Sequence, residues 1–123
     1  MKIRDMRKAL DSKEISAKEL AQTYFERIKK YDDKVKSFIT VTEEKAQGVI
    51  DNGEAKALTG IPVAVKDNIC TEGVKTTCAS KMLENFVPPY NATVMEKLDA
   101  ENIVMLGKTS MDEFAMGGST QTS

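Results

Sequence analysis

The sequence predicts an α/β fold, with helices packed on a mixed sheet. Short apolar runs rich in β-branched residues predict strands at 38–41, 61–66 and 103–106. Amphipathic stretches with helical spacing precede these runs and separate them. Strands that alternate with helices are typical of a sheet covered by helices.

One domain is expected, because 123 residues can bury one sizeable core. Residues 1–55 are expected to be mainly helical and residues 56–123 to form an α/β part with a lysine motif, together a single but incomplete domain. The net charge of −1, from 18 basic and 19 acidic residues, creates no field that would attract nucleic acid or an anionic membrane. No apolar run approaches the ~20 residues of a membrane span.

The first elements are two helices. Residues 3–11 predict a short helix, and Ser16 begins a capping box with Glu19. Asp32-Asp33 is expected to end this second helix. Its apolar stripe consists of Leu20, Tyr24, Ile28 and Tyr31.

The remaining elements alternate between strand and helix. After the strand at 38–41, a helix is predicted at about 42–51, ending at the turn signal Asp51-Asn52-Gly53. Asn91 is expected to cap a later helix that carries Met95. Four methionines are expected to be core filler: Met95, Met105, Met111 and Met116. The run "IVML", 103–106, predicts a buried strand that stops at Gly107.

Composition limits the chemistry. The chain has no histidine, which excludes Ser-His and Cys-His mechanisms within these residues. Cys70 and Cys78 have neither a partner pair nor a histidine for a zinc site, so we expect no metal and two structural, reduced thiols in a cytoplasm.

Lys66 ends an apolar strand, "IPVAVK". Both faces of this strand are apolar up to its end, which predicts a sheet covered on both sides. Open α/β sheets place their sites at the carboxyl ends of strands. A lysine there can also simply reach water, and position alone does not decide between the two. Asp67 and Asn68 are expected to bind local backbone as turn residues.

Two long strings carry a resemblance: "GIPVAVKDNICTEGVKTTCASKMLENFVPPYNATVMEKL" and "GKTSMDEFAMGGST". Together they closely resemble the amidase signature family. The resemblance is strong over 60–120 and weaker over 1–55. The strings "TTCASK", "ENFVPPY" and "MDEFAMGGST" are similar to the family's tRNA-dependent amidotransferase branch, which serves glutamyl-tRNA(Gln) or aspartyl-tRNA(Asn).

The resemblance implies a Ser-cisSer-Lys mechanism in which Lys66 matches the family's lysine and acts as general base. A serine activated through a second, bridging serine attacks the side-chain amide of glutamine and releases ammonia. A lysine is a base only when neutral, and its reference pKa of about 10.4 makes neutrality at pH 7 cost about 4.6 kcal/mol. Burial would have to supply that shift, so we expect Lys66 to lie inside.

Both family serines lie in segments that follow "MGGST". Ser119 and Ser123 are therefore not expected to be the nucleophile, and we expect these 123 residues, an N-terminal fragment with one catalytic group, to be inactive alone. Met116, Gly117, Gly118 and Ser119 match the segment that lines the glutamine pocket. An ordinary Gly-Gly turn is an equal alternative for them.

The resemblance also implies partners. The family branch works as a heterotrimer with B and C subunits, reaches charged tRNA through that complex, and uses ATP and Mg in a partner subunit rather than in this chain. The isolated fragment is expected to self-associate through open strand edges. Two alternatives remain: a fragment of a stand-alone amidase-signature hydrolase, and a non-catalytic folding or interaction module.

Overall fold

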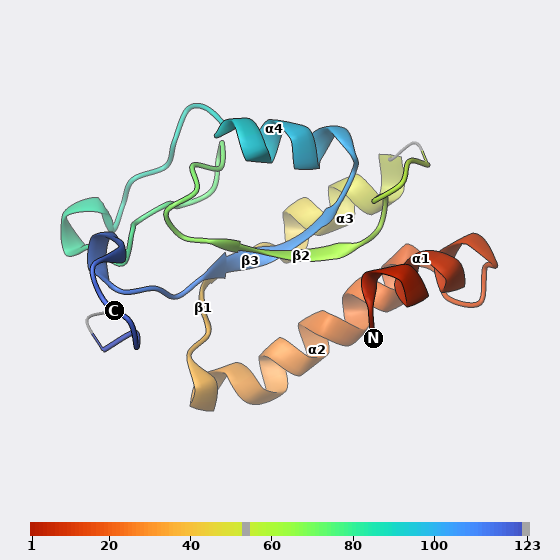
Figure 1. Cartoon of the computed structure of the whole chain (residues 1–123), viewed down its shortest axis with the longest axis horizontal. Helices are drawn as coiled ribbons and strands as arrows, with labels where there is room; N and C mark the ends of the chain where they lie inside the picture. Colours follow the sequence, from red (N-terminus) through yellow and green to blue (C-terminus); the bar gives the residue numbers. More distant parts are fainter. Residues whose placement is uncertain (53–54, 122–123) are drawn as a thin grey trace.

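The computed structural model describes residues 1–52 and 55–121. Figure 1 shows α4 on one side of the sheet and α1 and α2 on the other, which confirms the predicted α/β architecture. The elements in chain order are α1 (Ile3–Asp11), α2 (Ala17–Val35), β1 (Phe38–Val41), α3 (Glu43–Asn52), β2 (Pro62–Lys66), the 3₁₀ turn η1 (Lys81–Leu83), α4 (Thr93–Ala100), β3 (Val104–Thr109) and the 3₁₀ turn η2 (Glu113–Ala115).

The three strands form one mixed sheet in the order β1-β3-β2. β3 is parallel to β2 and antiparallel to β1. The predicted stop of the last strand at Gly107 is wrong, because β3 continues to Thr109, where Lys108 and Thr109 pair with Val65 and Lys66. The carboxyl ends of β2 and β3 therefore meet at one edge of the sheet, next to η2 (Figure 1).

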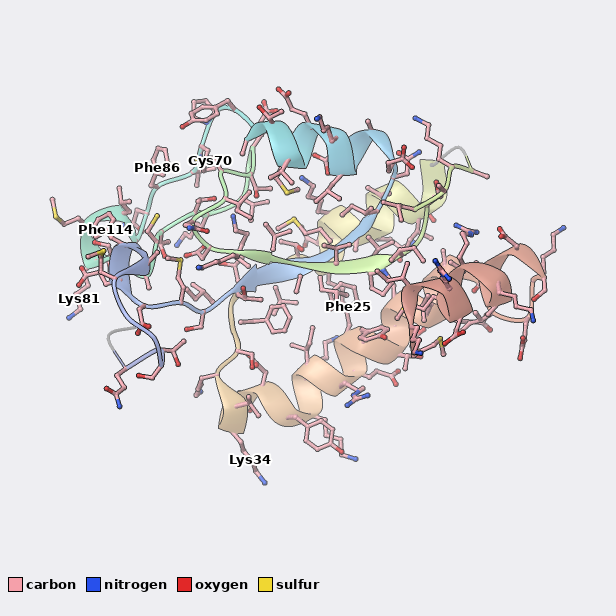
Figure 2. The ribbon with its side chains drawn as sticks, in the orientation of Figure 1. Phe25, Lys34, Cys70, Lys81, Phe86 and Phe114 are labelled. Atoms are coloured by element: carbon pink, nitrogen blue, oxygen red, sulfur yellow. The ribbon has the colours of Figure 1, made fainter. Side chains whose placement is uncertain are left out.

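Helices α2 and α3 pack on one face of β3. Figure 2 shows Phe25 between α2 and the sheet, and its side chain is buried. Of the apolar stripe predicted along α2, Tyr24 and Ile28 pack against this core. Leu20 is buried in a separate cluster with Met6 and Ile61, and Tyr31 is exposed. The buried members of the cluster around Phe25 are Ala21, Phe25, Ala46, Val104 and Leu106.

Helix α4 covers the opposite face. Met95, which is fully buried, packs there with Val65, Ile103 and Met105. Met95, Met105 and Met111 are buried, as predicted for core filler. The same prediction for Met116 is wrong, because its side chain is exposed. With a cluster on each face, residues 104–108 of β3 are all buried.

The N-terminus of α2 has the predicted capping box. The Ser16 hydroxyl accepts a hydrogen bond from the Glu19 amide at 3.2 Å, and the Glu19 carboxylate accepts one from the Ser16 amide at 2.9 Å. The helix runs two residues beyond the predicted Asp32-Asp33 end, to Val35. Asp32 still takes part in the ending, because its carboxylate accepts hydrogen bonds from the amides of Ser37 and Phe38.

The predicted boundaries of α3 and α4 can also be compared with the structure. The helix predicted at about 42–51 is α3, and the Gly53 of its turn signal lies outside the described residues. The cap predicted at Asn91 is wrong: Ala92 is the N-cap of α4 and makes no side-chain cap. The Asn91 side-chain oxygen instead accepts a hydrogen bond from the Glu72 amide at 2.7 Å, so it ties a distant loop to the start of the helix.

Candidate active site at the carboxyl edge of the sheet

Lys66 is the last residue of β2, and it pairs with Thr109 at the end of β3. Its side chain is exposed, so the expected burial of Lys66 is wrong. The reason is topological: β2 is an outer strand, and within the described residues its Ala64 and Lys66 positions stay open to solvent. Lys66 therefore stands at the predicted edge, on an uncovered part of the sheet.

Asp67 follows Lys66 and is fully buried. Its amide donates to the Thr109 carbonyl at 3.2 Å, and its Oδ2 accepts from both the amide and the hydroxyl of Thr77. Thr77 lies ten residues further along the chain, so the prediction that the Asp67 side chain binds local backbone as a turn residue is wrong. Its other oxygen, Oδ1, is buried with no hydrogen-bond partner among the described residues. A buried oxygen without a hydrogen bond lowers the stability of the fold, so a further hydrogen-bond donor at Oδ1 would be favourable.

Lys108 is the buried lysine of this edge, with 0% of its surface exposed. Its ammonium donates to the Ile69 carbonyl and to the hydroxyls of Thr71 and Thr76, each hydroxyl at 3.1 Å. Burial lowers the pKa of Lys108, while the negative charge of Asp67 works against that shift. The charged form is nevertheless well matched here, since three acceptors meet three ammonium N–H groups.

The "MGGS" segment follows η2, and Met116, Gly117, Gly118 and Ser119 are all exposed. Asp112 organises it, because its Oδ2 accepts a hydrogen bond from the Ser119 amide at 3.1 Å. A Cβ atom on Gly117 would lie 2.5 Å from the Asp112 carboxyl carbon, so a side chain there would clash. The Phe114 amide bonds to the Cys78 carbonyl at 3.0 Å, which holds η2 beside the loop that follows Lys66. The segment thus lies at the same edge of the sheet as Lys66.

The two cysteines are free. Burial raises the pKa of the Cys78 thiol, with the Asp67 charge adding to the effect. A raised thiol pKa disfavours the nucleophilic thiolate, in keeping with a structural role for Cys78. Cys70 donates to the Tyr90 hydroxyl at 3.5 Å.

A pocket of about 590 Å³ opens near this edge, between β1 and residues 75–84. Neither Lys66 nor the "MGGS" segment lines it. Residues 1–52 and 55–121 contain no group of three or more His, Cys, Asp or Glu side chains that could hold a metal ion. No helix in the same two ranges combines the length and apolarity needed to cross a membrane.

Residues 19–123 match the model of the family described as amidase. The chain belongs to the amidase family. It is 59% identical to the A subunit of a glutamyl-tRNA(Gln) amidotransferase of Ruminiclostridium cellulolyticum, an alignment that covers 98% of this chain and 26% of that relative. A protein of the same name from Caldanaerobacter subterraneus is 52% identical over the same shares. This amidase chain thus spans about a quarter of the length of the curated relatives it matches.

Solved structures agree with this family assignment. A crystal structure of the glutamyl-tRNA(Gln) amidotransferase A subunit from Thermotoga maritima superposes with a TM-score of 0.74 at 43% identity, covering 89% of this chain and 24% of that one. An inhibitor-bound structure from work on the origins of an s-triazine catabolic enzyme gives a TM-score of 0.92 at 30% identity. That alignment covers 100% of this chain and 29% of the other.

The sequence analysis did not identify Lys108 and Asp112, whose side chains hold loops in place at the carboxyl edge of the sheet. Lys108 follows "IVMLG", so a lysine adjoining a buried strand was the available signal. The acceptors of its ammonium lie 32 to 39 residues away in the chain, and no local pattern connects them. The carboxylate of Asp112 bonds to the amide of Ser119, seven residues further along, and no local pattern indicates this contact.

Proposed function

We propose that this chain is part of the glutamine-hydrolysing A subunit of a tRNA-dependent amidotransferase, and that Lys66 is its general base. The observation that carries the proposal is the 59% identity to the A subunit of a glutamyl-tRNA(Gln) amidotransferase across nearly all of this chain. The position of Lys66 supports it, because the side chain lies at the carboxyl edge of an α/β sheet and is free to meet further groups.

In the proposed mechanism, further segments of the parent protein cover Lys66, which is exposed here, and favour its neutral form. Neutral Lys66 accepts a proton from a nucleophilic serine through a bridging serine. The serine oxygen attacks the side-chain amide carbon of glutamine, and the C–N bond breaks. The amide nitrogen leaves as ammonia with the proton returned from Lys66, and water then hydrolyses the acyl-enzyme to glutamate. We assign both serines to segments other than these 123 residues, and we therefore expect these residues to be inactive alone.

The names of the relatives, each an A subunit, support a multi-subunit amidotransferase as the setting of this chain. An amidotransferase needs a subunit that receives the ammonia, and we assign this role, with ATP and Mg, to B and C subunits that also engage charged tRNA. The segment at 116–119 is proposed to line the glutamine pocket. The exposure of all four residues beside η2 supports this assignment.

A stand-alone amidase hydrolase is the alternative. It is supported by the structure of a native peptide amidase from Stenotrophomonas maltophilia, which matches 93% of this chain with a TM-score of 0.82 at 25% identity. The two readings differ in substrate and in dependence on partners.

Ammonia release by the full-length parent chain separates the two readings. We expect release from glutamine in the assembly with its partner subunits, stimulation by ATP and charged tRNA, and little release from propionamide. A full-length chain that hydrolyses simple amides faster than glutamine, with or without partner subunits, would contradict the amidotransferase assignment and support the hydrolase.

A further inference from the structure

The loop at 67–77 is closed on itself directly after Lys66. At its base, the Asp67 carboxylate accepts from the amide of Thr77 at 3.0 Å, and the Asp67 carbonyl accepts from the amide of Cys78 at 3.1 Å. Inside the loop, the amide of Val74 bonds to the carbonyl of Thr71. The two ends of the loop therefore meet at the end of β2, where Lys66 is located.

The interior of this loop holds the Lys108 ammonium. The hydroxyl protons of Thr71 and Thr76 are donated to the carbonyls of Ile69 and Val74, respectively. Both hydroxyls therefore offer lone pairs to Lys108, and the Ile69 carbonyl supplies the third acceptor. Thr71 and Thr76 are buried, so few water molecules compete with the ammonium for these oxygens.

Lys108 reaches the loop because β3 is irregular. The pairing of β2 with β3 shifts register between Val63 and Ala64, so that Gly107 faces Ala64 and Lys108 faces Val65.

Val65 belongs to the cluster under α4, on the side of the sheet where Ile69 and Val74 also pack. Register irregularities of this kind re-aim side chains. Lys66, one position further along β2, points to the opposite face.

We infer that Lys108 is a positioning residue: by holding the 67–77 loop against β3, it fixes the backbone from which Lys66 projects. The link is short, because the Lys66 carbonyl accepts the Ile69 amide and the next residue, Asp67, is bonded to β3. A methionine would fill similar space without the desolvation cost of a charge. A lysine that binds three loop oxygens favours the one loop conformation in which all three oxygens reach its ammonium. The inference rests on the proposed role of Lys66.

The test uses Lys108→Met in the full-length parent assembly. Hydrogen exchange should become roughly tenfold or more faster at the amides of residues 67–77, because hydrogen bonds to a charged group are lost. The kcat for glutamine should fall at least about tenfold while KM stays within about twofold, since a misplaced base affects the transition state more than binding. Lys75→Met is the matched control, because Lys75 lies in the same loop but is exposed.

A second pair of variants decides the matter if Lys108→Met does not fold. Thr71→Val removes an acceptor of Lys108 at nearly constant volume and should reproduce both effects, whereas Thr71→Ser keeps the hydroxyl and should restore them. Unchanged loop exchange in Lys108→Met or Thr71→Val would overturn the inference. Faster exchange with unchanged kcat would also overturn it, because the loop would then be loosened without affecting Lys66.

The exchange measurement does not depend on the reaction. If Lys66→Ala kept full activity, the proposed function would fail, and the positioning role with it, while loop exchange would still report whether Lys108 anchors the loop.

Discussion

Gly107 allows close approach of the strands at the point where Lys108 enters the core. A Cβ atom built on Gly107 would collide with the Thr40 carbonyl oxygen, and it would lie 2.9 Å from the Phe38 ring and 3.1 Å from the Val41 Cα. The first and last of these neighbours are backbone atoms of β1, so they cannot move aside without shifting the strand.

Gly107→Ala should therefore destabilise the fold by about 1–3 kcal/mol, the usual cost of overpacking. Gly48→Ala is the matched control, because Gly48 lies in α3 and a Cβ atom there meets nothing within 4 Å. That substitution should stabilise the chain by roughly 0.5–1 kcal/mol through helix propensity. Urea unfolding measures the change in the free energy of unfolding for each variant. Equal changes in the two variants would contradict this account of Gly107.

At this scale the sequence predicted where Lys66 lies but not how exposed it is. The position follows from the run "PVAVK", which is local. Exposure depends on β2 being an outer strand, and strand order is set by long-range pairing. The burial of Lys108 could not be predicted for the same reason. It requires the register shift between β2 and β3 and acceptors from a loop that is distant in the sequence. The catalytic role of Lys66 stays a prediction.

The N-terminus of α2 shows what a local pattern can predict at the scale of one element. Ser16 and Glu19 form the capping box from residues three apart, so the sequence suffices. The start of α4 could not be predicted in the same way. Asn91 has the chemistry of a cap, but Glu72, nineteen residues earlier, provides a competing donor for its oxygen.

The same capping box predicts an acid-sensitive contribution to stability. Hydrogen bonds from the backbone and side chain of Ser16 hold the pKa of Glu19 below its ordinary value of 4.5. Because the folded pKa is depressed, this contribution is present above about pH 4.5 and is lost as the pH falls through the folded pKa. Thermal unfolding of Glu19→Gln should show a lower Tm than wild type at pH 6, and the difference should shrink as the pH falls towards 3.

Glu14→Gln controls for the general loss of one exposed charge beside α2 and should show no such convergence. A Tm difference between wild type and Glu19→Gln that stays constant from pH 6 to pH 3 would contradict the contribution assigned to this carboxylate.

For the whole molecule, the sheet order places β1 and β2 on the outside, with β3 between them. Within the described residues, each outer strand has one edge without a strand partner, and Ile39 and Val41 of β1 are exposed. Such edges pair with other chains unless they are covered. Self-association of the isolated chain stays a prediction, and so does its assembly with partner subunits.

The central claim is that Lys66 supplies the base for glutamine hydrolysis in the full-length assembly. The most direct test is the steady-state rate of ammonia release by Lys66→Ala, with Lys75→Ala, an exposed lysine of the neighbouring loop, as control. We expect a loss of about 10²–10⁴-fold for Lys66→Ala, the usual cost of removing a general base. Lys66→Arg should fail as well, because a guanidinium stays protonated at any working pH. Lys75→Ala should keep wild-type turnover, and residual activity above ~1% of wild type in Lys66→Ala would contradict the claim.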